Sequence, residues 1–396
     1  MKKILLIFSA ALVMMLGSCE RTPDVLPQDE DQLLIKISEG DIVPGQYVVL
    51  LKDGVTTLKS SKLSYPDARS LMRSEMQKVL RASEIPEKEP LQIYTAAVEG
   101  FAVRLSGEEA EALERNPGVQ GVWPDKVIVL AKPVRPPAGP VSQITPPGIN
   151  RVGGGATYTG TSKAWIIDTG IDLTHPDLNV DKDLGQTFVP RTTSPNDDNG
   201  HGTHCAGIIA AIDNTIGVVG VAAGAKVVPV KVLDKRGSGY MSTIIAGVDY
   251  VAANGTEGDA VNMSLGGGAY DPLDAAVIAM GEIGLLVALA AGNSSADANN
   301  YSPARANGPN IYTVSACDSQ DVWAYFSNYG NPPVDFCAPG VSIYSTYKGG
   351  AYATMSGTSM AAPHVCGVLL ALGGGPNTKG YVINDPDENP DPIAHK

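Results

Sequence analysis

Three side chains of complementary chemistry are spread along the sequence after residue 160: an aspartate, a histidine and a serine. Asp168 ends an apolar run, residues 164–167, and a Thr-Gly turn follows it. His201 and Ser359 each lie where a glycine-containing turn leads into an apolar helical stretch. A serine hydroxyl becomes a useful nucleophile when a base takes its proton, and the base needs a carboxylate to fix its tautomer. The set therefore predicts nucleophilic acyl transfer.

Other readings of these residues are weaker. The Asp-Thr-Gly of residues 168–170 also occurs in aspartic proteases, but these need two such carboxylates and the sequence has no second copy. His204 and Cys205 follow His201 closely, yet no other His/Cys cluster completes a tetrahedral zinc set. We expect structural roles for His204 and His364, and a surface loop position for His175.

The elements that must position these residues follow from residue 148 onward. Short, fully apolar runs alternate there with helical stretches, which is typical of parallel strands covered on both faces. The runs are residues 164–167, 227–232, 260–263 and 285–291, and the helical stretches are 202–211, 242–253 and 272–283. We therefore predict an α/β domain over residues 148–396, with its reactive residues at the carboxyl ends of the strands.

The preceding part of the chain has a different pattern. Residues 45–130 have the order β-α-β-β-α-β, which predicts a small α+β domain of the ferredoxin-like type. Residues 131–147 hold six prolines and predict an exposed linker suited to cleavage.

The N-terminus has the form of an export signal. Lys2 and Lys3 precede an apolar run, residues 4–16, that is too short to span a bilayer. The run ends in Leu16-Gly17-Ser18-Cys19, which resembles a bacterial lipobox. We expect a signal peptide at residues 1–18, an acylated Cys19 that anchors the chain at a membrane surface, and a tether at residues 19–44. An ordinary cleaved signal is the alternative.

Composition and charge restrict the partners. The chain has 396 residues, 43% of them hydrophobic and 18% charged, which supports a packed core. Its net charge of −13 argues against a nucleic-acid partner. We expect a monomer.

Four cysteines remain if Cys19 carries lipid, and four allow three pairings. Cys317 and Cys337 each end a strand-like run and could lie side by side, so this pair is the candidate disulfide, with free thiols equally open. Cys205 and Cys366 lie in apolar helical runs and are expected to be buried thiols.

Residues 146–375 resemble the subtilase family of serine endopeptidases, and its proteinase K-like members most closely. The matching segments, in order, are Ile167-Asp168-Thr169-Gly170, Asn199-Gly200-His201-Gly202-Thr203-His204-Cys205-Ala206-Gly207, Lys231-Val232-Leu233-Asp234, Ser264-Leu265-Gly266-Gly267-Gly268, Ala290-Ala291-Gly292-Asn293 and Gly357-Thr358-Ser359-Met360. Residues 45–130 resemble the propeptides of that family in Gln46-Tyr47-Val48-Val49-Leu50-Leu51-Lys52, Gly100-Phe101-Ala102-Val103-Arg104-Leu105 and Val122-Trp123-Pro124-Asp125.

The resemblance implies a role for each matching residue. Asp168, His201 and Ser359 would form the triad, and Asn293 would donate a hydrogen bond to the oxyanion together with the Ser359 backbone N–H. The substrate would bind as an added strand between two edges, and uncharged walls would favour cleavage after apolar or aromatic residues. The edges would be Gly237-Ser238-Gly239 and Ser264-Leu265-Gly266, and the walls Leu265-Gly266-Gly267 and Ala290-Ala291-Gly292. Met241 stands where proteinase K-like enzymes carry a tyrosine, which puts the more distant apolar subsite in question.

The resemblance also implies a cofactor and a partner. Asp335, with the carbonyls of Pro309 and Ile311, aligns with a calcium site. Asp385, Asp387, Asn389 and Asp391 alternate with other residues, as ligands do in a calcium-binding loop, but this signal is weaker. The propeptide would assist folding, occupy the cleft through its last strand and be removed by self-cleavage. A serine esterase or peptide ligase would use the same triad. After the helix of Ser359 only a short acidic tail remains, without the family's final helix.

Overall fold

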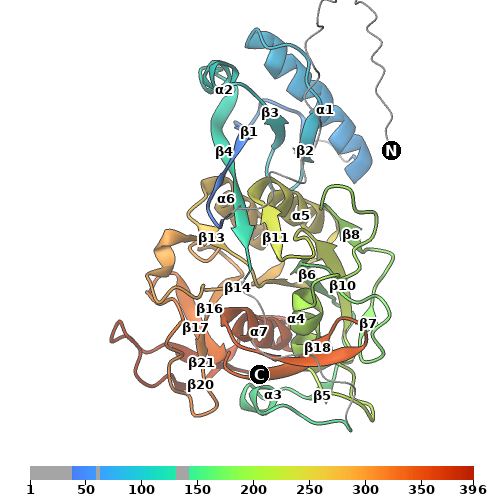
Figure 1. Ribbon diagram of the computed structural model, residues 1–396, viewed down its shortest axis with the longest axis vertical. Coiled ribbons are helices and arrows are strands. Elements are labelled where there is room, and N and C mark those ends of the chain that lie inside the picture. The colour runs from blue at the N-terminus through green and yellow to red at the C-terminus, as the bar shows by residue number, and fades with distance from the viewer. Residues whose placement is uncertain (1–37, 59–62, 131–141) are drawn as a thin grey trace, which may run out of the picture. The chain divides into compact units, whose positions relative to one another are not determined.

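The computed structural model describes residues 38–58, 63–130 and 142–396 (Figure 1). The expected signal peptide, the acylated Cys19 and most of the linker lie outside these residues. Within them, no helix combines the length and the apolar character needed to cross a membrane.

The first domain has the predicted order β-α-β-β-α-β. Its sheet is antiparallel, with the strand order β4-β1-β3-β2. The first strand begins at Ile42, inside the range expected to be a tether. The elements are β1 (Ile42–Leu51), α1 (Tyr65–Ala82), β2 (Pro90–Tyr94), β3 (Gly100–Arg104), α2 (Gly107–Glu114) and β4 (Val119–Val129).

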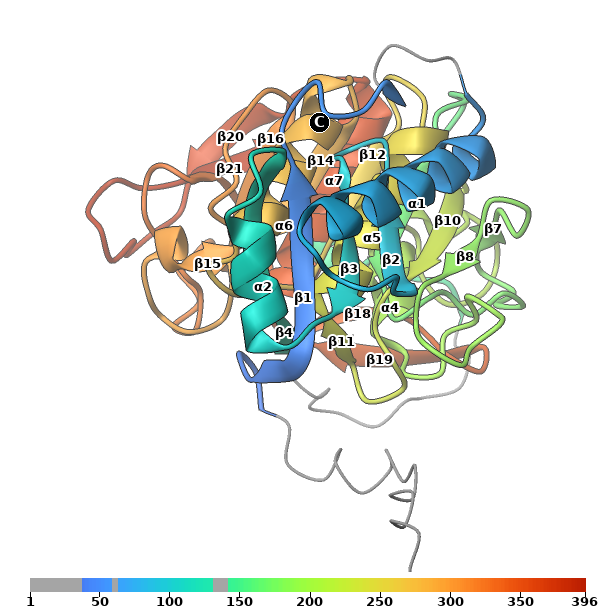
Figure 2. The ribbon, with the colours of Figure 1, turned by 90° about the horizontal axis from the view of Figure 1, so that it is seen from above.

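Local chemistry fixes both helices of this domain. The hydroxyl of Ser64 accepts a hydrogen bond from the backbone of Asp67 at the start of α1. Ser106 and Glu109 form a reciprocal capping box at the start of α2. Both helices lie across one face of the sheet (Figure 2), where Phe101 and Leu113 are fully buried.

The second domain contains the predicted parallel sheet. Its strand order is β20-β21-β17-β16-β14-β12-β6-β10-β7, and every pair from β21 to β7 is parallel. The fold is therefore of the α/β class. The strands are β6 (Ala164–Asp168), β7 (Asn179–Val180), β10 (Lys226–Lys231), β12 (Ala260–Met263), β14 (Leu286–Ala290), β16 (Ile311–Cys317), β17 (Val334–Pro339), β20 (Asn377–Tyr381) and β21 (Pro392–His395).

Helices cover both faces of this sheet, as the apolar strands predict (Figure 1). The side chain of Ile166 packs in the cluster that includes α4 (His201–Ala210) and α7 (Thr358–Leu372). Its neighbours Trp165 and Ile167 pack in the opposite cluster, with α5 (Met241–Asn254) and α6 (Asp271–Glu282). The shorter elements are α3 (Pro147–Arg151), β5 (Ala156–Thr157), β8 (Gln186–Thr187), β9 (Ala222–Ala223), β11 (Ser238–Tyr240), β13 (Gly267–Gly268), the 3₁₀ helix Ala298–Asn300, β15 (Tyr301–Ser302), β18 (Ile343–Tyr347) and β19 (Ala351–Met355).

The residues after α7 form more than the expected acidic tail. The strands β20 and β21 make an antiparallel hairpin, and β21 joins the main sheet beside β17 at the pair Cys337 and Ile393. Val382 and Ile393 are buried there against Cys317. This apolar contact holds the tail to the sheet, although no final helix follows α7 in the described chain.

Two sequence expectations are corrected by the structure. Cys317 and Cys337 are free, buried thiols rather than a disulfide. They lie on adjacent strands, but Cys337 pairs with Ser315, so the two cysteines are diagonal neighbours. His175 is buried rather than in an exposed loop, and its ring packs edge-on against Tyr352.

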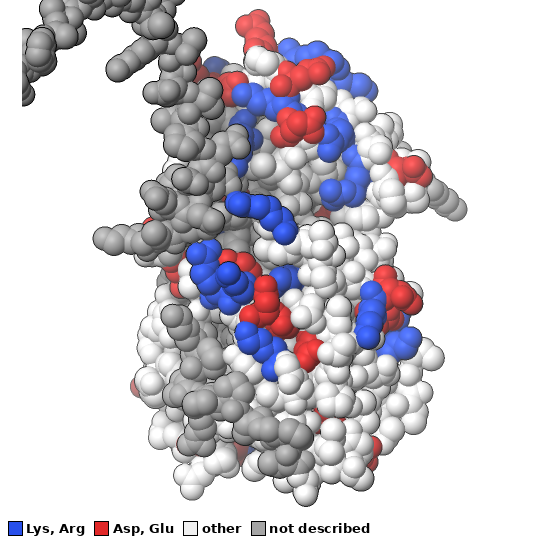
Figure 3. Space-filling view, turned by 45° about the vertical axis from the view of Figure 1, so that its right-hand side comes forward, with Lys and Arg blue, Asp and Glu red and all other residues white. Residues whose placement is uncertain are grey.

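The two domains share an apolar interface. Tyr94 and Ile128 of the first domain are fully buried in the same cluster as Met241 and Leu273 of the second domain. On the face shown in Figure 3, Lys and Arg residues lie among Asp and Glu residues, and large areas carry no charge.

Candidate active site

The aspartate and histidine predicted to work together do meet. Asp168 is the last residue of β6 and His201 is the first residue of α4. The Nδ1 atom of His201 lies 2.8 Å and 2.9 Å from the two carboxylate oxygens of Asp168. Both residues are buried. Burial alone lowers the pKa of His201, but the charge and hydrogen bond of Asp168, together with the contact of Cys205, outweigh it and raise that pKa overall.

A buried carboxylate that the sequence pattern did not reveal holds the loop before His201. Asp197 accepts hydrogen bonds from the backbone of Gly200 and from the backbone and hydroxyl of Thr203. It also accepts from the Thr169 hydroxyl, 2.9 Å away, which ties this loop to the turn after Asp168. The network fixes the imidazole relative to the carboxylate.

Position 200, next to His201, requires a glycine. Its φ is +116°, and an added Cβ atom would lie 2.2 Å from the ring of Tyr347.

The serine lies at the start of α7. Its Oγ atom donates to the carbonyl of Ser264, 3.2 Å away. Asn293 is beside it: its Oδ1 atom accepts from the backbone N–H of Thr358 at 2.8 Å and from the Thr358 hydroxyl at 3.1 Å. This orientation leaves the Nδ2 group of Asn293 as the donor that a substrate oxygen could meet. Thr358 is a second residue whose role the sequence pattern did not reveal.

A thiol lies beneath the imidazole, one helical turn after His201, as expected. The Sγ atom of Cys205 is 4.0 Å from the His201 Nδ1 atom and 3.4 Å from the carbonyl oxygen of Ser359. Burial raises the pKa of this thiol, so it stays neutral. Asp168, His201 and Cys205 are the one group of three possible metal ligands found among the described residues. Because two of them are already paired, we assign the group to the acyl-transfer site.

The predicted substrate edge is occupied. The last strand of the first domain, β4, pairs in antiparallel fashion with β11, with Val129 opposite Ser238 and Ile128 opposite Gly239. The backbone N–H of Leu130 donates to the carbonyl of Gly237 at 2.9 Å. The edge predicted at residues 237–239 therefore accepts an extended chain as an added strand.

The side chain of Ile128 occupies an apolar subsite on the catalytic domain. It is fully buried and packs in one cluster with Met241 and Leu265. A Cβ atom at Gly267 would lie 3.2 Å from Ile128, so the glycine leaves room for the side chain. Met241 therefore maintains an apolar subsite at the position that the sequence left in question.

The remaining predicted substrate residues lie in the same region. Ser264 donates through its hydroxyl to the carbonyl of Ser359, 2.8 Å away, which places its segment beside the serine. Ala290 and Ala291 are buried at the end of β14. Gly292 has a φ of +106° and lies against Asn328. The predicted walls, residues 265–267 and 290–292, contain no charged side chain.

Two buried carboxylates join the domains. Asp125 of β4 accepts from the backbone N–H of Ser242 at the start of α5, where a negative charge also suits the helix dipole. Asp249 of α5 accepts from the backbone N–H groups of Thr95, Ala96 and Ala97. Burial raises the pKa of each carboxyl to about 6.

Of the expected calcium ligands, Asp335 and Ile311 lie on neighbouring strands, β17 and β16. Asp335 accepts a hydrogen bond from the backbone of Thr313, and burial raises its pKa to about 6. A carboxylate in this state fits a cation ligand, because a bound cation would offset the burial. The carbonyl of Pro309 lies against Gly281 of α6.

Residues 385–391, which carry the weaker calcium pattern, lie in the turn of the C-terminal hairpin between β20 and β21. Asp385 accepts from the backbone of Asp391, and Asp391 accepts from the Ser315 hydroxyl.

Taken together, a serine at a helix start, a His–Asp pair and an amide donor beside a strand edge that binds an extended chain define a serine hydrolase on an α/β sheet. The subtilase family matches residues 163–374, and the peptidase inhibitor I9 family matches residues 46–131. "Alkaline serine protease ver112" of Corniculantispora psalliotae is 35% identical over 93% of this chain and 89% of its own length. "Extracellular serine proteinase" of Thermus sp. (strain Rt41A) is 36% identical over 90% of this chain and 86% of its own length. A solved cold adapted subtilisin-like serine proteinase matches 63% of this chain and 98% of its own, with a TM-score of 0.56 and 36% identity.

The chain belongs to the subtilase family of serine proteases. Residues 46–131 are its I9-type propeptide domain.

Proposed function

We propose that this protease is an exported endopeptidase in which Ser359 attacks the peptide carbonyl, His201 takes and returns the proton, and Asp168 holds the imidazole. The observation that carries the proposal is the buried His201–Asp168 pair at 2.8 Å, next to an edge that already binds an extended chain. The Asn293 amide and the backbone N–H of Ser359 would stabilise the oxyanion. The acyl-enzyme on Ser359 would then be hydrolysed by water that His201 activates.

The proposed specificity is broad, with cleavage after apolar or aromatic residues. It is supported by the small uncharged walls at residues 265–267 and 290–292. The burial of Ile128 against Met241 indicates that the enzyme also favours an aliphatic side chain further from the scissile bond.

We propose that the propeptide inhibits the enzyme until it removes itself. The pairing of β4 with β11 supports this, because the strand lies where a substrate would bind and leads directly into the linker of residues 131–147. If Cys19 is acylated, the lipid remains on the propeptide after cleavage. The catalytic domain is then held only by non-covalent contacts and leaves the membrane when the propeptide is degraded. Acyl groups on an active chain that contains Ser359 would refute this release.

We further propose a structural calcium ion held by Asp335 and by the carbonyls of Pro309 and Ile311. The buried carboxylate of Asp335 supports the site. The ion would stabilise the strand ends near the substrate pocket.

Mass spectrometry of exported wild-type chain and Ser359→Ala tests the proposed function. Wild type is expected to lose about 140 residues while Ser359→Ala stays full length, because the cut lies in an exposed linker and needs the serine. Equal cutting of both proteins would show that another protease does the processing. An uncut wild type would refute the activity or the role of the propeptide.

A further inference from the structure

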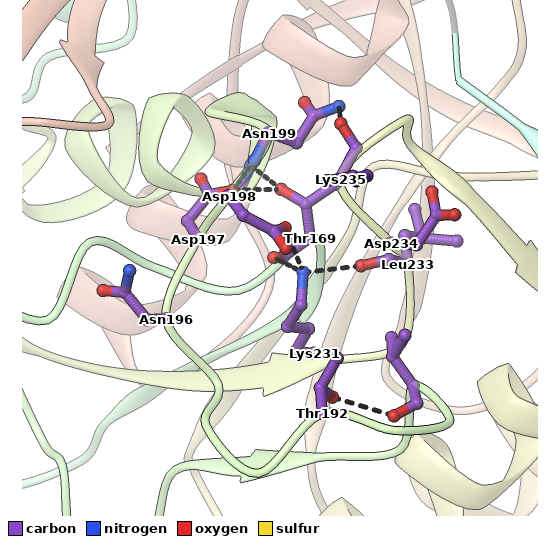
Figure 4. Close-up of polar contacts among 12 residues, drawn as sticks. Thr169, Thr192, Asn196, Asp197, Asp198, Asn199, Lys231, Leu233, Asp234 and Lys235 are labelled. Carbon is purple, nitrogen blue, oxygen red and sulfur yellow. Dashed lines mark hydrogen bonds and ion pairs between the residues drawn. The ribbon is translucent and has the colours of Figure 1, made fainter.

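A buried lysine joins the segments that form the active site. The side chain of Lys231, at the end of β10, is only 1% exposed. Its Nζ atom donates to the carbonyl of Thr169 at 2.6 Å, to the carboxylate of Asp198 at 2.7 Å and to the carbonyl of Leu233 at 2.8 Å (Figure 4). An ammonium group has three donors, so these contacts use all of them.

Each acceptor belongs to a different part of the site. Thr169 directly follows Asp168, and Lys231 itself lies opposite Asp168 in the pairing of β10 with β6. Asp198 lies in the loop that leads to His201. Leu233 precedes the turn that begins the substrate edge. In this turn the carbonyl of Asp234 accepts from the backbone N–H of Gly237, and the backbone N–H of Asp234 donates to the carbonyl of Ser238.

A second contact supports the same connection. The Nδ2 atom of Asn199, two residues before His201, donates to the carbonyl of Lys235 at 3.2 Å. Figure 4 shows this contact beside that of Lys231. The histidine loop and the segment before the substrate edge are therefore joined at two points.

Burial shows why this lysine is more than a surface charge. Asp198 is 45% exposed and can turn to water, whereas the carbonyls of Thr169 and Leu233 are buried with their residues. Loss of the amino group would leave these two carbonyls without the donor that holds their segments together.

We propose that Lys231 is a positioning residue that couples the placement of the Asp168–His201 pair to the placement of the substrate edge at residues 237–239. This inference rests on the proposed function, because it assigns Lys231 a part in the same reaction.

The test compares Lys231→Met, Lys231→Arg and a control, Lys226→Met, each expressed as the full chain and assayed after self-processing. Lys226 lies on the same strand, but its side chain is 56% exposed and, among the described residues, its amino group pairs with Asp181 at 3.8 Å. Active sites are titrated with a fluorophosphonate, so each kcat refers to folded enzyme. A short ester and an extended peptide that reaches the edge are the substrates.

Lys231→Met is expected to lower kcat for both substrates by about 10- to 100-fold, as small displacements of catalytic groups do, and to raise KM for the extended peptide alone. Lys231→Arg keeps the charge and should restore most of kcat, and Lys226→Met should stay within about twofold of wild type. If Lys231→Met lowers only the melting temperature and the titrated fraction, with kcat and KM unchanged, the lysine is merely structural and the proposal is wrong.

If Lys231→Met does not fold, Asp198→Ala tests the proposal in its place. The Asp198 side chain is half-exposed, so its loss should leave the protein folded. A kcat lower by about threefold or more per titrated site supports the coupling, and an unchanged kcat overturns it. A wild-type chain that does not react with the fluorophosphonate refutes the proposed function and this inference together, whereas an active wild type with an equally active Lys231→Met refutes the inference alone.

Discussion

Replacing Asp249 by asparagine should change how pH controls propeptide binding. Within the described chain, the hydrogen bonds to the Asp249 side chain come from the propeptide: it accepts from the backbone of residues 95–97, from the Thr95 hydroxyl and from the hydroxyl of Tyr65. Arg69 is linked to Asp249 through Tyr65, because its guanidinium group donates to the Tyr65 hydroxyl. In the free catalytic domain the carboxylate would face water instead.

The size of the expected effect on propeptide binding follows from the pKa of Asp249. Burial raises the pKa of Asp249 from its ordinary 3.8 to about 6. Because each tenfold change in proton affinity corresponds to about 1.4 kcal/mol, the ionised form weakens the complex by up to about 3 kcal/mol, or about 100-fold. A group whose pKa is raised in the complex stabilises it at low pH, and this stabilisation is lost as pH rises through about 6. Between about pH 5 and pH 8, Asp249 alone should weaken binding about tenfold.

The assay measures the inhibition constant of one propeptide preparation against mature wild type and against Asp249→Asn, from about pH 5 to pH 8. Asparagine keeps an oxygen that accepts from residues 95–97 but cannot ionise. Asp125 also has a raised pKa, but it lies on the propeptide and so contributes equally to both profiles. The same holds for any pH-dependent folding of the isolated propeptide.

Asp249→Asn is therefore expected to bind the propeptide more tightly than wild type at about pH 8, with a profile that is shallower by about tenfold. Parallel profiles for the two enzymes would show that the buried carboxylate does not link binding to pH. Weaker binding of Asp249→Asn at every pH would show that hydrogen bonds to the charged form outweigh burial, which would refute the sign of the argument.

Three further results are expected. Asn293→Ala should lower kcat by about 10²–10³ with little change in KM, a range established for the oxyanion donor of subtilisin rather than worked from this geometry; an unchanged kcat would contradict the role. Asp391→Asn should raise the melting temperature more at about pH 8 than at about pH 5, because burial raises the pKa of Asp391 to about 7 and the ionised form costs more stability as pH rises from the ordinary pKa through that value; equal gains at both pH values would contradict this. Chelation of calcium should lower the melting temperature of wild type more than that of Asp335→Asn, and equal losses would exclude this site.

The sequence predicted the parts of the site that depend on chain order. Asp168 and His201 could be placed together because Asp168 ends a strand of the parallel sheet and His201 begins a helix that packs on that sheet. The substrate edge at residues 237–239 was likewise predicted from the family motifs. The roles of Asp197 and Lys231 were not, because a buried charge is recognised by what surrounds it, and these partners come from loops far apart in the chain.

The two expectations that the structure corrects, for Cys317–Cys337 and for His175, also depend on contacts between segments that are distant in the chain. Cys317 and Cys337 were correctly placed on strand-like runs, but a disulfide depends on register, and a shift of two residues along a strand is not visible in the pattern. His175 was expected on the surface because its segment is polar, whereas its ring packs against Tyr352 from a distant strand.

The position of β21 also bears on the order in which the chain can fold. The propeptide is made first and contains its own core, so it can fold while the rest of the chain is still emerging. The catalytic sheet is different, because its strand β21 comes after α7 and lies beside β17. The sheet therefore stays incomplete until residues 392–395 have emerged, and the whole inhibitor domain has been synthesised before the protease can assemble its last strand.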